Sequence, residues 1–200
     1  MRASIKQKGR YSIRIVGGRF SGLRIIAPSG QLTRPTGERV REAVFNSLQG
    51  WVSGARVLDL YAGSGAMGLE SLSWGASYCL FVEPNRQALN AIRTNILHLN
   101  VKEMTELWSM TAEQAVERLQ ALDARFDLII CDPPWRQGLS PTVRMALVHL
   151  LTADGIALIE HPSGADFGPF EGLHLSKQRK YGGTTLSYWV HDDSLALPES

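Results

Sequence analysis

Three glycines with the spacing G-x-G-x-x-G, at Gly63, Gly65 and Gly68, follow an apolar run that contains Asp59. Glu83 lies twenty residues beyond the first of these glycines, at the end of the next apolar run. A glycine-rich turn between a strand and a helix lets the backbone approach a nucleotide, and an acid at the end of the next strand accepts hydrogen bonds from ribose hydroxyls. The glycines alone would also suit a structural turn, but together with Glu83 they favour a nucleotide-binding loop.

Asp59 helps to distinguish the ligands that such a loop could take. A dinucleotide places its pyrophosphate at this turn, where a carboxylate would repel it. S-adenosylmethionine has no phosphate and carries a positive sulfonium and an ammonium group, which a carboxylate attracts. The pair Asp59 and Glu83 therefore predicts S-adenosylmethionine rather than NAD. A helix-capping role is the alternative interpretation of Asp59.

A second pattern, Asp132-Pro133-Pro134-Trp135, follows directly on the apolar run 126–131. Ligands of open parallel sheets lie outside the carboxyl ends of the strands, so this pattern and the glycine loop should meet at one edge. The prolines stiffen the turn and leave backbone carbonyls as acceptors. Asp132 and the Pro133 carbonyl are predicted to accept both hydrogens of an exocyclic amine, and Trp135 to stack on a base. A rigid turn that ends in a core tryptophan is the alternative.

That arrangement suits methyl transfer to a nucleobase amine. Such an amine delocalises its lone pair into the ring and is a poor nucleophile, so catalysis has to come from orientation and electrostatics. Two acceptors can hold the nitrogen in line with the sulfonium methyl group once the base has left its stack. Cys131 precedes Asp132 and points to the opposite side of the strand, so it is predicted to pack in the core and not to act as a nucleophile.

Strands and helices alternate from residue 56 onward, which predicts βαβ units and a mostly parallel sheet. The predicted strands are 56–60, 78–83, 105–109, 126–131 and 155–160, and the predicted helices are 67–74, 86–97, 112–122 and 141–151. Two further β runs, 173–179 and 184–190, are joined by Gly182-Gly183 and predict an antiparallel hairpin. The fold class is therefore α/β with the layout of class I S-adenosylmethionine-dependent methyltransferases, a Rossmann-like, mostly parallel seven-stranded sheet that ends in a C-terminal antiparallel hairpin.

A small N-terminal hairpin-helix extension precedes this sheet. Two β-prone runs, 13–17 and 23–26, flank a glycine-containing turn and predict a hairpin. Thr36 is placed to cap a following helix, and Gly50 is predicted to end it. The predicted domains are a basic N-terminal extension over 1–50, a methyltransferase domain over 51–191 and a loose tail over 192–200.

The net charge of +2 conceals a basic N-terminus. Residues 1–50 contain ten Lys or Arg and two acids, whereas residues 51–200 contain eleven basic and seventeen acidic residues. A basic arm on a mildly acidic body indicates an anionic macromolecular partner, or else an arm that is merely solvated. Some of the arginines could instead brace the two nearby acids. The predicted RNA contacts are Arg19, Arg34, Arg39 and Arg41, and the alternative RNA surface is Lys177, Arg179 and Lys180.

Several other classes of protein are not indicated. The two cysteines lie within apolar runs, provide no disulfide framework and fit a reducing compartment. The five histidines form no paired-ligand motif, so we expect no metal. No apolar stretch approaches the ~18 residues of a membrane helix, and the N-terminus lacks a signal-peptide core. We therefore expect a monomeric cytoplasmic protein that does not enter membranes.

Beyond these patterns, the chain from about residue 13 to residue 189 resembles the bacterial 16S ribosomal RNA guanine-N2 methyltransferases. The residues that carry the resemblance are Ile15-Val16-Gly17-Gly18, the stretch from Thr33-Arg34-Pro35-Thr36 to Arg39-Val40-Arg41-Glu42 with Phe45-Asn46, the loop from Asp59 to Gly68, Asp132-Pro133-Pro134-Trp135, and Tyr181-Gly182-Gly183-Thr184. The N-terminal stretch is the specific part, because the loop and the tetrapeptide are shared by many amino-methyltransferases.

The resemblance implies methyl transfer from S-adenosylmethionine to the 2-amino group of one guanine in the 16S ribosomal RNA of the assembled small subunit. The catalytic residues that it implies are Asp132, Pro133, Pro134 and Trp135, and the cofactor contacts are Asp59, Tyr61, Gly63, Ser64, Gly65, Glu83, Thr111 and Ala112. Thr111 stands where related enzymes often place Asp or Asn near the adenine amine. Two further departures are Trp135, where Phe or Tyr is more usual, and Gly183, where Asp is common.

Three other functions compete with this one. A DNA or protein-amide amino-methyltransferase would use the same tetrapeptide, but it gives no reason for the arginine-rich arm. An NAD-linked oxidoreductase is disfavoured by Asp59 and by the absence of a hydride-transfer acid. A noncatalytic RNA-binding module is disfavoured because the residues of both the ligand loop and the amine pocket are intact.

Overall fold

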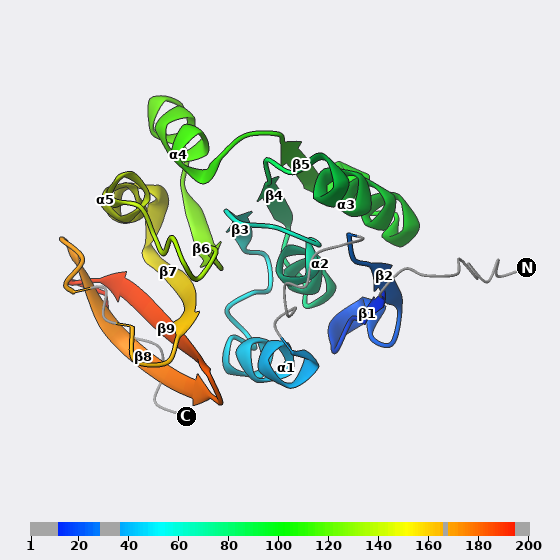
Figure 1. Cartoon of the computed structure of the whole chain (residues 1–200), viewed down its shortest axis with the longest axis horizontal. Coiled ribbons are helices and arrows are strands. Elements are labelled where there is room, and N and C mark those ends of the chain that lie inside the picture. Colours follow the sequence, from blue (N-terminus) through cyan, green and yellow to red (C-terminus); the bar gives the residue numbers. More distant parts are fainter. Residues whose placement is uncertain (1–11, 29–36, 166–167, 195–200) are drawn as a thin grey trace, which may run out of the picture.

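The computed structural model describes residues 12–28, 37–165 and 168–194 of the chain (Figure 1). Its main feature is a seven-stranded sheet in the order β5-β4-β3-β6-β7-β9-β8. The first five strands in this order, β5 to β7, are parallel to one another. Strand β9 is antiparallel to β7, and β8 is antiparallel to β9. The strands are β3 (Arg56–Asp59), β4 (Tyr78–Val82), β5 (Thr105–Trp108), β6 (Phe126–Cys131), β7 (Leu151–Pro162), β8 (Leu173–Tyr181) and β9 (Thr184–His191). This topology confirms the predicted class I methyltransferase fold.

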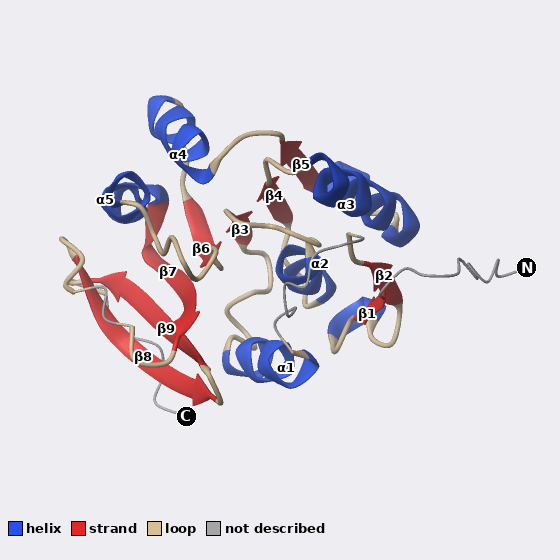
Figure 2. Cartoon of the chain, viewed as in Figure 1, coloured by secondary structure: helices blue, strands red, loops and turns tan. Residues whose placement is uncertain are grey.

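Helices cover both faces of the sheet (Figures 1 and 2). They are α1 (Glu38–Ser47), α2 (Ala66–Ser73), α3 (Arg86–Leu99), α4 (Ala112–Ala121) and α5 (Pro141–Leu150). Buried side chains of α1, α2 and α3 pack on one face of the sheet, and those of α4 and α5 pack on the other. Strand residues alternate between these two clusters, as the period of two in an extended strand requires.

Most predicted boundaries agree with the observed elements to within two residues, but β7 does not. This strand begins at Leu151, directly after α5, and not at Gly155. The pairing of β6 with β7 shifts register between Phe126 and Leu128. Phe126 pairs with Leu151 and Leu128 pairs with Ile156, so β7 has extra residues between the two pairs. The polar residues at the start of β7 resemble a turn in the sequence, which is why the sequence predicts a later start for this strand.

The two ends of α1, the helix of the N-terminal extension, also differ from the prediction. Thr36, the predicted cap, lies outside the described residues, and the residue at the cap position is Gly37, without a side-chain cap. The helix ends at Ser47 with Leu48 at the C-cap position, before the predicted stop at Gly50.

The predicted N-terminal hairpin is present as β1 (Ser12–Arg14) and β2 (Arg24–Ile26), with a short 3-10 helix, η1 (Gly18–Phe20), in the connection. Buried residues of the hairpin belong to the same hydrophobic cluster as α1, α2 and α3. The connection lies against the end of α2, where a Cβ on Gly17 would overlap the Trp74 ring and one on Gly18 would overlap the Ser73 carbonyl. The extension is therefore packed onto the sheet-bearing part of the chain and shares its core.

Glu70 of α2 joins the extension to this core. Its carboxylate accepts the backbone N–H groups of Val16 and Gly17, each at 3.0 Å, and the indole N–H of Trp74 at 3.2 Å. It also forms a buried ion pair with Arg41 of α1, with Nε and Oε2 3.6 Å apart. A guanidinium N–H of Arg41 donates in turn to the Arg14 carbonyl at 2.7 Å. One buried carboxylate thus fixes β1, the Gly17 turn and α1 on α2.

Candidate active site

The carboxyl ends of β3, β6 and β7 bring three acids to one edge of the sheet. Asp59 ends β3, Asp132 follows β6, and Glu160 lies near the end of β7. The side chains two residues before these acids all belong to the cluster under α1, α2 and α3, so alternation places the acids on that same face. We refer to Asp59, Asp132 and Glu160 as the rim acids.

The glycine loop between β3 and α2 has the conformation that its glycines allow. Gly63 and Gly65 have positive φ angles of 52° and 76°, and Gly65 is the residue before α2. A Cβ on Gly68 would overlap the Phe81 ring and the Cys79 sulfur of β4, so this glycine permits close packing of the helix on the sheet. The first two glycines therefore allow the backbone conformation of the turn, and the third allows α2 to lie close to β4. A nucleotide-binding loop uses its glycines in the same way.

Asp59 is buried, and its Oδ2 accepts the backbone N–H of Gly68 at 3.0 Å. It thus bonds to the first turn of α2, which is the capping role that the sequence left as the alternative. Burial and, to a smaller extent, the charge of Glu83 raise the pKa of Asp59 to about 7, against the lowering effect of the hydrogen bond from Gly68. A positively charged ligand near Asp59 would favour the ionised carboxylate, so capping and ligand attraction are compatible.

Glu83 orders the glycine loop from the end of β4. One carboxylate oxygen accepts the N–H of Gly63 at 2.8 Å, and the other accepts the N–H of Asn85 at 2.8 Å. Each oxygen of a carboxylate has a second lone pair, so the two ribose hydroxyls of a nucleoside can still be accepted. The residues present therefore fit S-adenosylmethionine.

We expect the Glu83→Ala substitution to weaken S-adenosylmethionine binding by about 1–3 kcal/mol, the usual loss for a hydrogen bond to a charged group. Isothermal titration calorimetry measures this change directly. Glu103→Ala is a suitable control, because Glu103 is exposed and lies just before β5 at the opposite edge of the sheet. Equal dissociation constants for the wild type and the Glu83→Ala variant would contradict the role of Glu83, as would tight NAD binding by the wild type.

The remaining predicted cofactor contacts lie around the same edge. Tyr61 is partly buried against the cluster under α4 and α5. The Ser64 carbonyl accepts from the side chain of Asn95 at 3.3 Å. Thr111 caps α4 in a capping box with Gln114, so its hydroxyl already has a structural role, and Ala112 is buried. The contacts of these four residues with the cofactor stay a prediction.

Asn95 of α3 is a buried residue whose importance the sequence did not reveal. Its side chain accepts the Ile26 N–H and donates to the Ile26 carbonyl, each at 2.9 Å, while also donating to Ser64. It therefore connects strand β2 of the extension with the glycine loop. The signal of this role in the sequence is an asparagine at helical spacing from the apolar residues Ala91, Ile92 and Leu99.

The tetrapeptide after β6 lies at the surface beside a small pocket. Pro133 is buried, Pro134 is exposed, and Trp135 exposes 49% of its surface. The pocket has a volume of about 70 Å³ and is lined by Pro133, Trp135, Gly138, Glu160, His161, Pro162 and Ala165. The alternative that Trp135 is a core residue is therefore wrong, and its indole is available for stacking.

Asp132 and Cys131 lie in different surroundings at the end of β6. Burial raises the pKa of Asp132 well above its usual range, and the charges of Glu160 and Asp59 raise it further. Cys131 is fully buried on the side of α4 and α5, and burial raises the pKa of its thiol. The thiolate form that a nucleophile needs is thus disfavoured, as expected for a packing residue.

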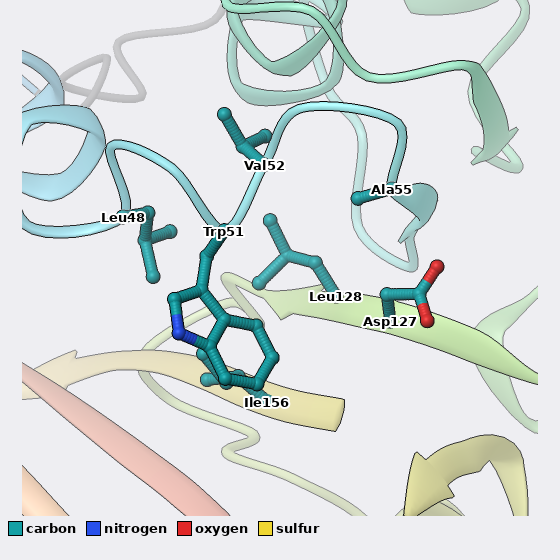
Figure 3. Close-up of a pocket in the computed structure, with 7 residues that line it drawn as sticks. All are labelled: Leu48, Trp51, Val52, Ala55, Asp127, Leu128 and Ile156. Carbon is teal, nitrogen blue, oxygen red and sulfur yellow. The ribbon is translucent and has the colours of Figure 1, made fainter. Parts of the chain in front are cut away.

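A second cavity lies beside the start of β6, where Asp127 and Leu128 line it together with Ile156 of β7 (Figure 3). It has a volume of about 10 Å³ and is lined mainly by apolar side chains, among them Trp51 and Ile156. Asp127 borders it, but its carboxylate accepts the Arg56 N–H and the Thr152 hydroxyl. A space of this size holds at most about one water molecule, so it is a packing gap.

The predicted RNA-binding arginines are found in three different situations. Arg41 is only 1% exposed and is held by Glu70 and the Arg14 carbonyl, so the prediction that it contacts RNA is wrong. Arg39 is exposed on α1, and Arg34 lies outside the described residues. The exposed Arg19 lies over the Phe20 ring and donates to the sulfur of Met104 at 3.3 Å.

Arg19 and the alternative cations lie at opposite edges of the sheet. Met104 immediately precedes β5, so Arg19 lies at the amino ends of the strands. The turn between β8 and β9 is at the carboxyl edge, since Thr184 pairs with Pro162 of β7 and the Gly183 carbonyl accepts the Ser163 N–H at 2.8 Å. Arg179 and Lys180, near this turn, are exposed and close to the pocket rim.

Other kinds of site have no candidates within the described ranges. No group of three or more His, Cys, Asp or Glu residues there could hold a metal ion. Among the same residues, no helix has the length and apolar character needed to cross a membrane.

Comparisons with known proteins place the chain among methyltransferases. The family described as conserved hypothetical protein 95 matches residues 13–190. A Bacillus subtilis protein, the rRNA methyltransferase-like YlbH, is 28% identical over 180 residues, which are 88% of this chain and 98% of that protein. The Escherichia coli ribosomal RNA small subunit methyltransferase D is 34% identical over 131 residues, which are 66% of this chain and 64% of that protein.

Solved structures agree with this assignment. A Thermus thermophilus protein, TTHA0928, has a TM-score of 0.76 at 27% identity, with 90% of this chain and 99% of that chain covered. The protein SMU.776, solved with S-adenosylhomocysteine, shares the fold with a TM-score of 0.71 at 10% identity, covering 94% of this chain and 57% of that chain. The chain therefore belongs to the conserved hypothetical protein 95 family, as the resemblance predicted, and is a methyltransferase whose cofactor is S-adenosylmethionine.

Proposed function

We propose that this protein transfers a methyl group from S-adenosylmethionine to the exocyclic 2-amino group of a guanine in 16S ribosomal RNA. The observation that carries the proposal is that Asp132 and Pro133 follow β6 directly and lead to the half-exposed Trp135, at the same sheet edge as the glycine loop. The rRNA substrate is supported by the names of the Bacillus subtilis and Escherichia coli relatives. We further propose that the protein acts as a cytoplasmic monomer on the assembled small subunit.

In this mechanism the chain holds two reactants in line. When bound, S-adenosylmethionine supplies a methyl group on a positively charged sulfur, and Asp59, Glu83 and the glycine loop would hold it. Asp132 and the Pro133 carbonyl accept the two amine hydrogens, which directs the nitrogen lone pair at the methyl group. The cofactor would supply the methyl carbon for the new bond to nitrogen, and its sulfur would keep the electron pair of the bond that is given up. The methylated nitrogen then loses its proton to water, so no strong general base is needed.

The surface position of Trp135 fits a base that has left its helix. A base inside a duplex cannot reach an amine pocket at the end of a strand, so it has to rotate out of its stack. Base–aromatic stacking contributes about 1–3 kcal/mol per base and can partly offset the cost of unstacking. An indole with half of its surface exposed can receive such a base without rearranging the core.

RNA binding provides a test of which edge of the sheet faces the substrate. We expect the double variant with Arg179→Ala and Lys180→Ala to bind small-subunit RNA more weakly at moderate salt. Its plot of log affinity against log salt should flatten by about one unit for each phosphate that is no longer bound, because binding to phosphates releases counterions. Filter binding over a salt series measures the slope, and calorimetry should show unchanged S-adenosylmethionine affinity.

Arg19→Ala is the matched control, since Arg19 is an exposed cation at the far edge. A flattened slope for Arg19→Ala combined with an unchanged slope for the double variant would assign the RNA surface to the basic arm. Arg19, Arg34 and Arg39 stay predicted contacts of the arm, and the comparison of the two slopes decides between them and the cations near the β8–β9 turn.

Mapping of the modified nucleotide tests the function in the cell. In a strain that lacks this gene, we expect mass spectrometry of 16S ribosomal RNA to show the loss of one N2-methylguanosine, with the methylation restored by the wild-type gene. An unchanged set of rRNA methylations, together with a lost methylation in DNA or protein, would favour the alternative amino-methyltransferase.

A further inference from the structure

Glu160 is a buried acid next to the amine pocket, and nothing in the proposed mechanism uses it. It lines the pocket together with Pro133 and Trp135. The last observed pair between β6 and β7 joins Cys131 and Ile159, so Asp132 and Glu160 follow at the same level on neighbouring strands. Alternation places both side chains on the same face of the sheet.

This juxtaposition brings two acids into one electrostatic environment. Removing a carboxylate from water is unfavourable, and a second negative charge nearby adds repulsion. The effect is visible at Asp132, whose pKa is raised by burial first and then by the charge of Glu160. A ligand with several hydrogen-bond donors along one edge matches such a pair of neighbouring acids.

Guanine has such an edge. Its Watson–Crick side carries the N1–H donor immediately beside the 2-amino group, whereas adenine has an acceptor at N1 and no amine at C2. Neighbouring strands lie about 4.8 Å apart, so carboxylates at one level on β6 and β7 are spaced to reach adjacent donors of one base. An adenine in this pocket would direct its N1 lone pair at a carboxylate.

We propose that Glu160 determines base specificity by accepting the N1–H of the target guanine while Asp132 and the Pro133 carbonyl hold the 2-amino group. This inference rests on the proposed guanine-N2 activity and assigns the recognition of the purine ring to a second residue. Glu160 thus contacts the substrate without taking part in the bonds that form and break.

The test compares guanine with 2-aminopurine, which keeps the 2-amino group and has an acceptor in place of N1–H. Small subunits are reconstituted with 16S ribosomal RNA that carries either base at the mapped position, and kcat/KM is measured for each. We expect the wild type to prefer guanine by about tenfold or more, the low end of the range for a lost hydrogen bond to a charged group. Wild-type enzyme that methylates both bases equally well would overturn the proposal without any variant.

Glu160→Gln then assigns the preference to this residue, because an amide can accept from N1–H of guanine and can donate to N1 of 2-aminopurine. We expect its guanine preference to fall to within about threefold of unity, with S-adenosylmethionine affinity unchanged. Glu171→Gln, at an exposed acid of the same C-terminal part, should keep the wild-type preference. A Glu160→Gln variant that keeps the wild-type preference would overturn the inference.

The experiment distinguishes a failure of the proposed guanine-N2 activity from a failure of the proposed role of Glu160. If wild-type enzyme leaves guanine N2 unmethylated in these particles, the proposed function fails. If it forms N2-methylguanosine and Glu160→Gln does not alter the ratio of the two bases, the proposed function stands and only the role of Glu160 is lost.

Discussion

The Asp132→Ala variant is expected to transfer methyl groups ~10²-fold more slowly than the wild type, or slower still, in a single-turnover assay. The carboxylate is proposed to orient the amine, an interaction expressed mainly in the transition state, so its loss should reduce the chemical step. The dissociation constant for S-adenosylmethionine should stay close to the wild-type value, because the glycine loop is held by Asp59 and Glu83.

Asp132→Asn is the informative companion variant. Its side-chain carbonyl can still accept one amine hydrogen, but the negative charge is lost, so an intermediate rate is expected. A rate for Asp132→Ala within about threefold of the wild type would mean that Asp132 does not orient the amine.

The second large effect concerns stability. We expect Arg41→Ala to lower the free energy of unfolding by about 3–5 kcal/mol, the range found when one partner of a buried ion pair is removed. Burial lowers the pKa of Arg41 and raises that of Glu70, and the charge of each partner shifts the pKa of the other in the opposite direction. Removing the guanidinium also leaves the Arg14 carbonyl without its 2.7 Å hydrogen bond.

Urea denaturation followed by circular dichroism measures this change. Arg39→Ala is a closely matched control, since Arg39 lies two residues away on the same helix but is exposed. We expect it to alter stability by less than about 0.5 kcal/mol, as is usual for surface positions. Equal midpoints for Arg41→Ala and the wild type would show that the ion pair does not hold the extension on α2.

The elements that position the site could be predicted from the sequence because each has a local signal. The run from Phe126 to Cys131 is uniformly apolar apart from Asp127 and gives β6 with its observed bounds. The three glycines and Glu83 have fixed spacing, and the structure joins Gly63 to Glu83 by a hydrogen bond. In these places the local pattern and the tertiary packing favour the same conformation.

Features that depend on contacts between distant residues escaped the sequence, and Arg41 and Glu160 illustrate this as Asn95 does. Arg41 belongs to a stretch rich in arginine, and only the packing of α1 on α2 shows that it faces Glu70, 29 positions later, instead of solvent. Glu160 follows a run of apolar residues, as Glu83 does, but its significance depends on the register between β6 and β7. Charge counts treat all such residues alike, whereas burial separates them.

The most direct measurement is the identity of the methylated nucleoside. Purified protein is incubated with small subunits from the deletion strain and with S-adenosylmethionine that carries a trideuterated methyl group, and the RNA is digested to nucleosides for mass spectrometry. The proposed chemistry predicts the trideuterated methyl group on N2 of guanosine, with the signal lost in the Asp132→Ala variant. A label on another nucleoside such as N6-methyladenosine, on a ribosomal protein, or on neither would contradict it.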